Sequence, residues 1–401
     1  MLDLNKLQLQ IKALSKHQRD RIRGIAEAFS IAGEQVNLVS DNVEAFVNKV
    51  SRSSTSWLVA MPTGEHPFAS HLPTACPGSY TILSTDGSQI NPDRHSPYHA
   101  FLINIGKVEI SYGDYLGYRL ESEPSLFFEE KDIMRRFGGK EREVSGGVLA
   151  ALRQKMESDA LTNMIEGCEA KPAVALIDGT LILWSLETEP GILEGLGTDD
   201  LKLQSFISLM QLISTGKISN VPVAGYISSP GSSDVVNSLK VSLCPSDPVD
   251  CDNCPYKAAG FDGALPCAKI DGITDAGLFR QLLQFGERSS LFGSISKILK
   301  DYGEEKIYFF YINMGKEIAR IEVPGWVAHD PATVELVHSI CLDQASKGVG
   351  YPIAVAEAHE QAVVKQADKN MFDQLVLQAL IRQGSPVIES RKAIRKKGGF
   401  V

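Results

Sequence analysis

Two apolar stretches of the sequence each end in an aspartate, a glycine and a hydroxyl residue. They are Tyr80–Ser88, which carries Asp86, and Ala173–Thr180, which carries Asp178. Mg²⁺ and Mn²⁺ prefer oxygen ligands, so a site for either ion needs carboxylates that converge from separate elements. The glycine would let the chain turn sharply away after each carboxylate. Asp-Gly also forms ordinary turns, but its repetition after two apolar stretches favours a metal site.

A helix predicted over residues 141–168 supplies a third carboxylate. Its apolar residues recur at helical spacing, and Arg153 and Glu157 lie one turn apart on one face. An ion pair within the helix is the ordinary interpretation of these two residues. Metal binding by Glu157 is the alternative, and Asp159, the other candidate on this helix, cannot share its face.

A tyrosine and a histidine near the C-terminus complete the candidate set. Tyr351 precedes Pro352, which is well placed at the start of a helix, and His359 lies about two turns inside that helix. Such a histidine is commonly a packing residue. With three carboxylates nearby, His359 would instead suit a metal ligand or a general acid or base.

Strands alternate with helices along the chain, which is typical of an α/β core. We expect hairpin turns at Gly106-Lys107 and at Gly113-Asp114. The helix predicted over residues 2–34 is amphipathic and suits packing or dimerisation, with a nucleic-acid-binding arm as the alternative. The remaining elements are predicted as strands over 173–180, 221–228, 306–313 and 317–323, and as helices over 199–216, 276–284, 331–347, 354–368 and 371–382.

The composition of the 401-residue chain is that of an ordinary globular protein, with 43% apolar and 22% charged residues. The net charge of −9 argues against a uniformly basic nucleic-acid coat protein, but not against a local basic channel. No apolar run reaches the roughly 18 to 20 residues of a membrane span. Because no secretory signal is recognisable, we expect a cytoplasmic protein that does not enter a membrane.

Four of the seven cysteines crowd into one segment, with six, two and twelve residues between them. They are Cys244, Cys251, Cys254 and Cys267. Four thiolates can hold a tetrahedral zinc ion or an iron–sulfur cluster, and a metal-free thiol-rich loop is the alternative. The isolated Cys76, Cys168 and Cys341 are expected to be buried.

The ordered set of motifs resembles the NurA nucleases. The set runs from Asp-Gly-Ser at Asp86 through Arg-x3-Glu at Glu157 and Asp-Gly-Thr at Asp178 to Tyr-Pro-x6-His at Tyr351 and His359. The likeness covers about residues 80 to 365. It also includes Gly225–Pro230 and Ala319–Pro324, while Thr180 stands where serine is common.

The resemblance implies a ribonuclease H-like mixed sheet flanked by helices, a homodimer and degradation of DNA with Mn²⁺ or Mg²⁺. It implies 5′-to-3′ exonuclease or single-strand endonuclease activity in DNA end resection and repair, together with a HerA-like hexameric ATPase. Asp86, Glu157 and Asp178 match the metal-binding carboxylates, and Tyr351 and His359 match the remaining active-site pair. His359 is counted as a further metal ligand.

Candidates for DNA contact are Arg153, Arg320 and the basic tail that contains Arg391 and Lys397. We expect an N-terminal helical segment over residues 1–75, a nuclease domain over 76–385 with a cysteine-bearing insertion at about 240–275, and a tail over 386–401. Two other functions stay open. One is a non-catalytic dimeric adaptor of a DNA translocase, and the other is a phosphotransferase of the actin-like ATPase type.

Overall fold

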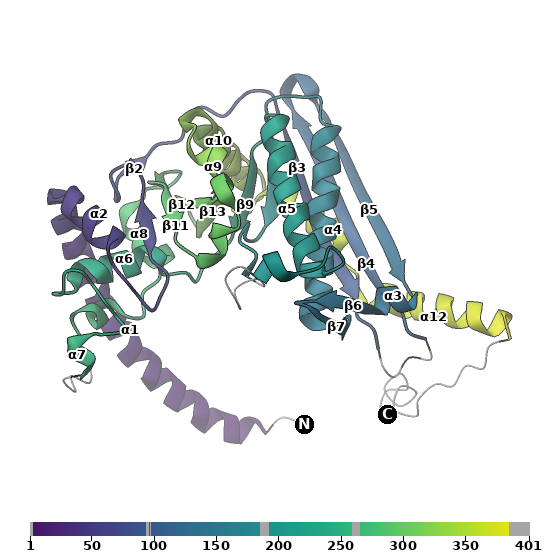
Figure 1. Cartoon of the computed structure of the whole chain (residues 1–401), viewed down its shortest axis with the longest axis horizontal. Coiled ribbons are helices and arrows are strands. Elements are labelled where there is room, and N and C mark those ends of the chain that lie inside the picture. The colour runs from purple at the N-terminus through teal and green to yellow at the C-terminus, as the bar shows by residue number, and fades with distance from the viewer. Residues whose placement is uncertain (1–2, 94–95, 97, 185–191, 259–264, 385–401) are drawn as a thin grey trace. The chain divides into compact units, whose positions relative to one another are not determined.

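The computed structural model describes residues 3–93, 96, 98–184, 192–258 and 265–384 (Figure 1). The chain divides into two compact units, each built from separate stretches of sequence. Unit 1 comprises Met1–Thr74, Ile227–Leu299 and Lys306–Glu322, and unit 2 comprises Ala75–Tyr226, Lys300–Glu305 and Val323–Val401. The predicted basic tail lies outside the described residues.

A mixed sheet forms the centre of unit 2. Its strand order is β9 (Val223–Ile227), β8 (Ala173–Asp178), β3 (Tyr80–Ile90), β4 (Phe101–Tyr112) and β5 (Gly117–Phe127). The first three strands are parallel, whereas β3, β4 and β5 are antiparallel neighbours. Strands β8 and β9 are short and almost wholly apolar, which is the pattern of parallel strands covered on both faces.

The predicted turn at Gly106-Lys107 is wrong, because β4 runs through both residues without interruption. Gly106 pairs with Asp86 of β3 in the middle of the antiparallel ladder. The predicted turn at Gly113 is confirmed: a 3₁₀ helix, η1 (Gly113–Tyr115), connects β4 to β5. A second expectation also fails, since β3 does not turn away after Asp86 and extends to Ile90.

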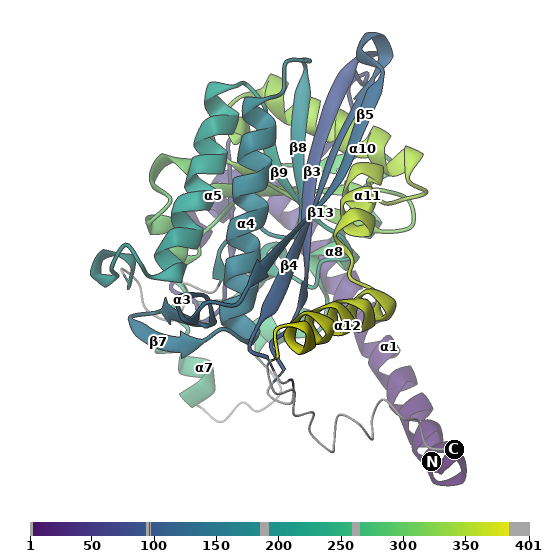
Figure 2. The same cartoon turned by 90° about the vertical axis from the view of Figure 1, so that its right-hand side faces the viewer.

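Helices cover both faces of this sheet, as Figure 2 shows. Helices α4 (Gly146–Glu166) and α5 (Leu201–Ile218) lie on one face, and α11 (Ile353–Ala362) lies on the other. Apolar residues of α4 and of alternate positions in β4 form one buried cluster, which includes Phe101, Ile103, Leu149 and Leu152. The helices on the two faces of the sheet therefore contact alternate residues of the same strands.

The remaining elements of unit 2 are short, apart from two helices of 17 residues each. They are α3 (Glu130–Ile133), β6 (Met134–Phe137), β7 (Lys140–Glu143), η3 (Ile192–Gly195), η6 (Gly303–Glu305), α9 (Gly325–Ala328), α10 (Pro331–Lys347) and α12 (Gln366–Arg382). The helix predicted over 331–347 is confirmed. The single helix predicted over 354–368 is wrong, because α11 ends at Ala362 and a separate helix starts at Gln366.

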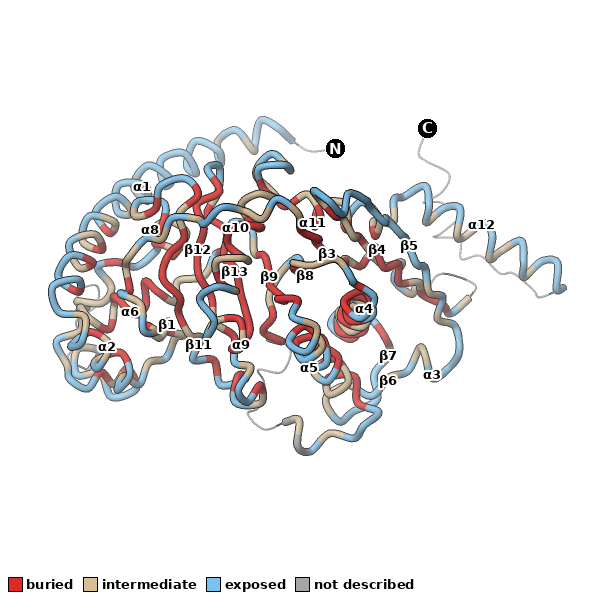
Figure 3. Tube along the Cα trace, turned by 90° about the horizontal axis from the view of Figure 1, so that it is seen from above, coloured by how far each residue is buried: buried red, intermediate tan, exposed pale blue. Residues whose placement is uncertain are grey.

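Unit 1 contains its own strands in the order β1 (Ala60–Pro62), β11 (Phe292–Ser294), β12 (Ile307–Asn313) and β13 (Ile318–Pro324). Around them lie α1 (Leu4–Asp41), α2 (Val43–Ser51), β2 (Ser70–His71), α6 (Asp234–Leu243), α7 (Pro255–Ala258), η4 (Pro266–Ile270), α8 (Asp275–Leu282), β10 (Arg288–Ser289) and η5 (Lys297–Lys300). Among the residues of α1 whose burial is described, only Ala28, Ala32, Val36 and Val39 in its second half are buried (Figure 3).

Among the helices that the structure describes, none combines the length and the apolar character needed to cross a bilayer.

Candidate active site

The sheet register of unit 2 brings the two aspartates together. Thr85 of β3 pairs with Ile177 of β8 in parallel, so Asp86 and Asp178 follow side by side at the next position. Beyond Asp178 the chain leaves the sheet at Gly179, whose φ is +115° and whose N–H donates to Tyr226 O at 2.8 Å. The expected sharp turn is therefore confirmed after the second aspartate, although not after the first.

Successive residues of β3 face opposite helices. The Thr85 hydroxyl donates to Glu157 O in α4 at 3.1 Å, whereas Asp86 meets His359 of α11. In the parallel pairing Asp178 has the same facing as Asp86. The side chains of the two aspartates therefore point toward α11, and Glu157 approaches from the opposite face of the sheet, which α4 covers.

His359 reaches Asp86 because α11 lies directly on β4. Nδ1 of His359 is 2.8 Å from Oδ2 of Asp86. A Cβ atom at Gly106, the partner of Asp86 in the ladder, would stand 2.2 Å from Ala358 O. Asn104, on the same face of β4, donates through Nδ2 to Gln361 O and to Ala362 O at 3.1 and 2.8 Å. The absent side chain and these two hydrogen bonds together set the position of α11.

Tyr351 is held at the same face by aromatic packing. Its ring meets Tyr226 edge-on, with centroids 5.5 Å apart and an interplanar angle of 89°. Tyr226 is buried and pairs with Asp178 in the β8–β9 ladder. Burial raises the pKa of Asp178, the side-chain hydrogen bond from Tyr351 lowers it, Asp86 raises it further, and His359 lowers it. Tyr351, Asp86 and His359 therefore all lie close enough to Asp178 to change its pKa.

Glu157 occupies the space that a side chain at position 87 would fill. A Cβ atom on Gly87 would stand 2.4 Å from Glu157 Oε1 and 2.7 Å from Arg153 Cγ. Oε1 of Glu157 lies 3.2 Å from Arg153 Nε, yet neither atom makes a hydrogen bond within the described part of the chain. Burial raises the pKa of Glu157 to about 8; Arg153 opposes the shift, and Asp86 and Asp178 add to it.

This carboxylate set suits a hard divalent cation. Three carboxylates influence one another, and one carries a buried oxygen without a hydrogen-bond donor. Placing such oxygens together is unfavourable unless a cation or a proton neutralises them. As the side chains are placed, no group of three or more His, Cys, Asp or Glu in the described residues forms a ready metal-binding arrangement. Binding would therefore require these side chains to exchange their contacts with His359 and Arg153.

The two arginines predicted to contact DNA lie in different environments. Arg153 is on α4, has a side chain 36% exposed, and donates through Nη1 to Gln89 Oε1 at 3.2 Å. Arg320 is in unit 1 with a side chain only 4% exposed, ion-paired to Asp234 at 2.9 Å and to Glu322 at 3.0 Å. Its guanidinium also lies over the Phe309 ring, 3.7 Å from the centroid. This buried position is incompatible with direct DNA contact, so the prediction for Arg320 is wrong.

Three positions that support the site escaped the sequence analysis. The sequence predicts a turn at Gly106, but in the structure the missing side chain leaves room for α11. The sequence also predicts a turn at Gly87, but there the missing side chain leaves room for Glu157. Tyr226 lies in the segment that resembles the family, yet only the β8–β9 pairing places it beside Asp178. For the two glycines, the signal available in the sequence was their place inside otherwise apolar strand patterns.

The fold is that of an α/β protein, and its candidate active site is acidic. The site combines two aspartates at neighbouring strand positions with a glutamate from one covering helix and a histidine from the other. The chain belongs to the NurA domain family, whose sequence profile matches residues 80–364, more than half of its length.

Solved structures match this chain at low sequence identity. The NurA nuclease from Sulfolobus solfataricus is 14% identical with a TM-score of 0.47, covering 88% of this chain and 98% of that chain. A structure described as NurA bound to dAMP and manganese is 11% identical with a TM-score of 0.43, covering 92% and 97%. One described as NurA with manganese is 10% identical with a TM-score of 0.40, covering 90% and 98%. No protein with a curated description matches the chain.

Proposed function

We propose that this protein is a metal-dependent deoxyribonuclease that hydrolyses phosphodiester bonds of DNA. The observation that carries the proposal is the convergence of Asp86 and Asp178 with His359 and Tyr351 on one face, with Glu157 beside them at Gly87. Membership of the NurA domain family supports it.

Asp86, Glu157 and Asp178 would hold Mn²⁺ or Mg²⁺, with His359 as a further ligand or as a proton-transferring group. A bound divalent cation lowers the pKa of water and neutralises charge on the phosphate. The raised pKa of Glu157 means that its proton has to leave when the cation binds. Arg153, already paired with Glu157, keeps a partly exposed guanidinium for a phosphate oxygen.

Hydrolysis joins one water oxygen to phosphorus, breaks one P–O bond and returns a proton to the leaving oxygen. His359 is suited to transfer a proton, because its side chain is 60% exposed and Asp86 orients the imidazole through Nδ1. Tyr351 orients Asp178 through its side-chain hydrogen bond. Gln89 and Gly87 keep Arg153 and Glu157 in place at the α4 face.

Further parts of the proposal rest on the resemblance to the family. They are a ribonuclease H-like core, a homodimer, cytoplasmic action in DNA end resection and repair, and cooperation with a HerA-like hexameric ATPase. An acidic chain can bind DNA when cations and a few arginines face the phosphates at the site.

The test measures degradation of single-stranded DNA and of linear duplex DNA by the full chain with Mn²⁺, with Mg²⁺ and with chelator. Asp86→Ala and Asp178→Ala should each abolish the activity that Mn²⁺ supports. Asp159→Ala is the matched control, because Asp159 lies on α4 near Glu157 but is paired with Lys155 at 2.6 Å. Full activity in both aspartate variants would contradict the site. Binding of a DNA-translocating ATPase without degradation under any metal condition would favour the adaptor function.

A further inference from the structure

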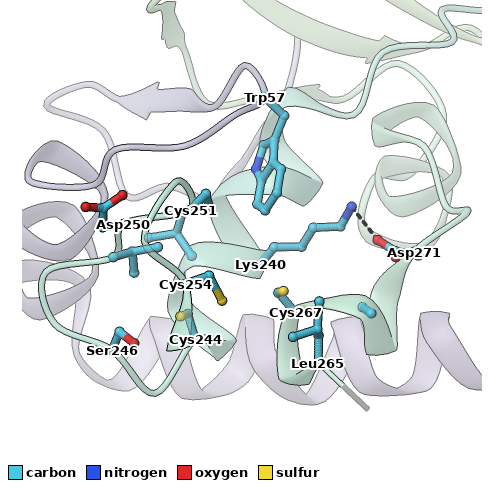
Figure 4. Close-up of a pocket in the computed structure, with 13 residues that line it drawn as sticks. Trp57, Lys240, Cys244, Ser246, Asp250, Cys251, Cys254, Leu265, Cys267 and Asp271 are labelled. Carbon is cyan, nitrogen blue, oxygen red and sulfur yellow. Dashed lines mark ion pairs between the residues drawn. The ribbon is translucent and has the colours of Figure 1, made fainter. Parts of the chain in front are cut away.

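Four cysteines of unit 1 line one pocket. Cys244, Cys251, Cys254 and Cys267 surround a cavity of about 260 Å³ together with Trp57 and Lys240. In Figure 4 the labelled sulfur atoms of Cys244, Cys254 and Cys267 gather in the middle of the pocket. The cysteines come from the end of α6, from the segment before α7 and from η4, so the fold brings together residues from three places in the sequence.

The described lining of the pocket supplies four sulfur atoms and one cationic side chain, that of Lys240. Lys240 borders the pocket, but its ammonium group is paired with Asp271 at 2.6 Å and lies 5.7 Å from the Trp57 ring centroid.

The described part of the cysteine segment contains little regular structure. Between α6 and α8 the described elements are the four-residue α7 and the five-residue η4. The turn from Cys251 to Cys254 is shaped by Asp250, whose Oδ1 accepts N–H groups from Asp252 and Asn253 at 3.0 and 3.2 Å. The segment buries Val249, Cys251, Ile270 and Ile273, and a metal cross-link would add to the stability that this packing provides.

We propose that Cys244, Cys251, Cys254 and Cys267 bind one zinc ion as four thiolates, and that the ion is structural. Binding releases the four thiol protons and leaves a tetrathiolate centre of charge −2. As placed, the four side chains do not form a ready metal-binding group among the described residues. The zinc ion would draw their sulfur atoms to about 2.3 Å from itself.

The site is distinct from the proposed nuclease centre in ligand type and in the unit that carries it. All four cysteines belong to unit 1, and Asp86, Glu157 and Asp178 belong to unit 2. Thiolates select zinc, whereas carboxylates select manganese or magnesium. Because the zinc ion is structural, its loss should lower the thermal stability of the protein. This readout does not depend on nuclease activity.

The experiment is metal analysis of the full chain, purified in parallel with and without air and washed with a weak chelator. We expect about one zinc per chain in the wild type and in Asp86→Ala. Cys254→Ser and Cys267→Ser should each lower the zinc content at least fivefold, and Cys254→His should restore most of it because imidazole can replace one thiolate. Cys76→Ser, in unit 2, is the control and should keep its zinc.

A second measurement on the wild type guards against variants that fail to fold. Titration with a thiol-specific mercurial should release zinc in step with the reaction of four thiols. Cobalt in place of zinc should give the intense visible bands of a tetrahedral thiolate site. Three results would overturn the proposal: no metal in either preparation, iron with inorganic sulfide in the anaerobic preparation, or undiminished zinc in both serine variants.

Discussion

Nδ1 of His359 lies 2.8 Å from Oδ2 of Asp86, although the two residues are 273 positions apart in the chain. The contact depends on Gly106, which pairs with Asp86 and whose missing side chain allows α11 to lie on β4. The position of His359 thus depends on Gly106, which has no side chain and takes no part in catalysis itself. Substitutions at the glycines and at His359 test this relationship.

Replacing Gly106 with alanine should destabilise the protein and separate His359 from Asp86. The new Cβ would meet the α11 backbone at Ala358 O and, 2.6 Å away, at Ala362 N. A backbone clash cannot be relieved by one side-chain rotation, so we expect a loss of about 1–3 kcal/mol. Thermal unfolding followed by circular dichroism measures it. Gly117→Ala in β5 is the control, because its nearest neighbour would be 3.6 Å away. Equal melting temperatures for the two variants would contradict the account.

Replacing Gly87 with alanine should affect activity more than stability. Its Cβ would meet the side-chain atoms Glu157 Oε1 and Arg153 Cγ, which can move. We expect the melting temperature to change little and the Mn²⁺-supported rate to fall roughly 100-fold, because a misplacement of about 1 Å is sufficient for that loss. Rates and melting curves are measured on the same preparations. A variant that keeps its full rate would show that Glu157 is not needed in this position.

Replacing His359 with alanine distinguishes its two possible roles. If the imidazole is a metal ligand, the activity lost in the variant should be largely recovered at higher Mn²⁺ concentration. If it transfers a proton, the rate should stay about 10²–10⁴-fold lower at saturating Mn²⁺. The measurement is the initial rate over a Mn²⁺ titration. An unchanged rate and an unchanged metal dependence would exclude both roles.

Replacing Asp275 with asparagine should flatten the pH dependence of stability. Burial raises the pKa of Asp275 from 3.8 to about 7, and the charge of Asp234 adds to the shift. The folded state therefore binds a proton that the unfolded state has lost, so this contribution is full below about pH 4 and disappears as the pH rises through 7.

Urea unfolding at pH 5 and pH 8 measures the change. The wild type should lose more stability than Asp275→Asn between these pH values. The asparagine can still accept from Val236 N–H and pair with the Tyr311 hydroxyl, which now bond Asp275 at 2.8 Å each. Asp247→Asn, at an exposed position, should behave like the wild type. Parallel curves for wild type and Asp275→Asn would refute the assignment.

The sequence by itself determined the local elements that carry the candidate site. The apolar stretches before Asp86 and Asp178 form strands, and the periodic segments around Glu157 and His359 form helices. Such patterns are local, since a strand or helix buries the face that its own residues define. The ordered motifs also indicated the family that the profile match then showed.

Only the tertiary structure decided which of these residues meet and what the glycines are for. The parallel register sets Asp178 beside Asp86, and Gly106 lies under α11 where the sequence indicated a turn. Likewise Arg320, one of several arginines in the sequence, proves to be enclosed by Asp234, Glu322 and Phe309. Strand pairing and helix docking join residues that are far apart in the chain. Their outcome depends on contacts that no local pattern contains.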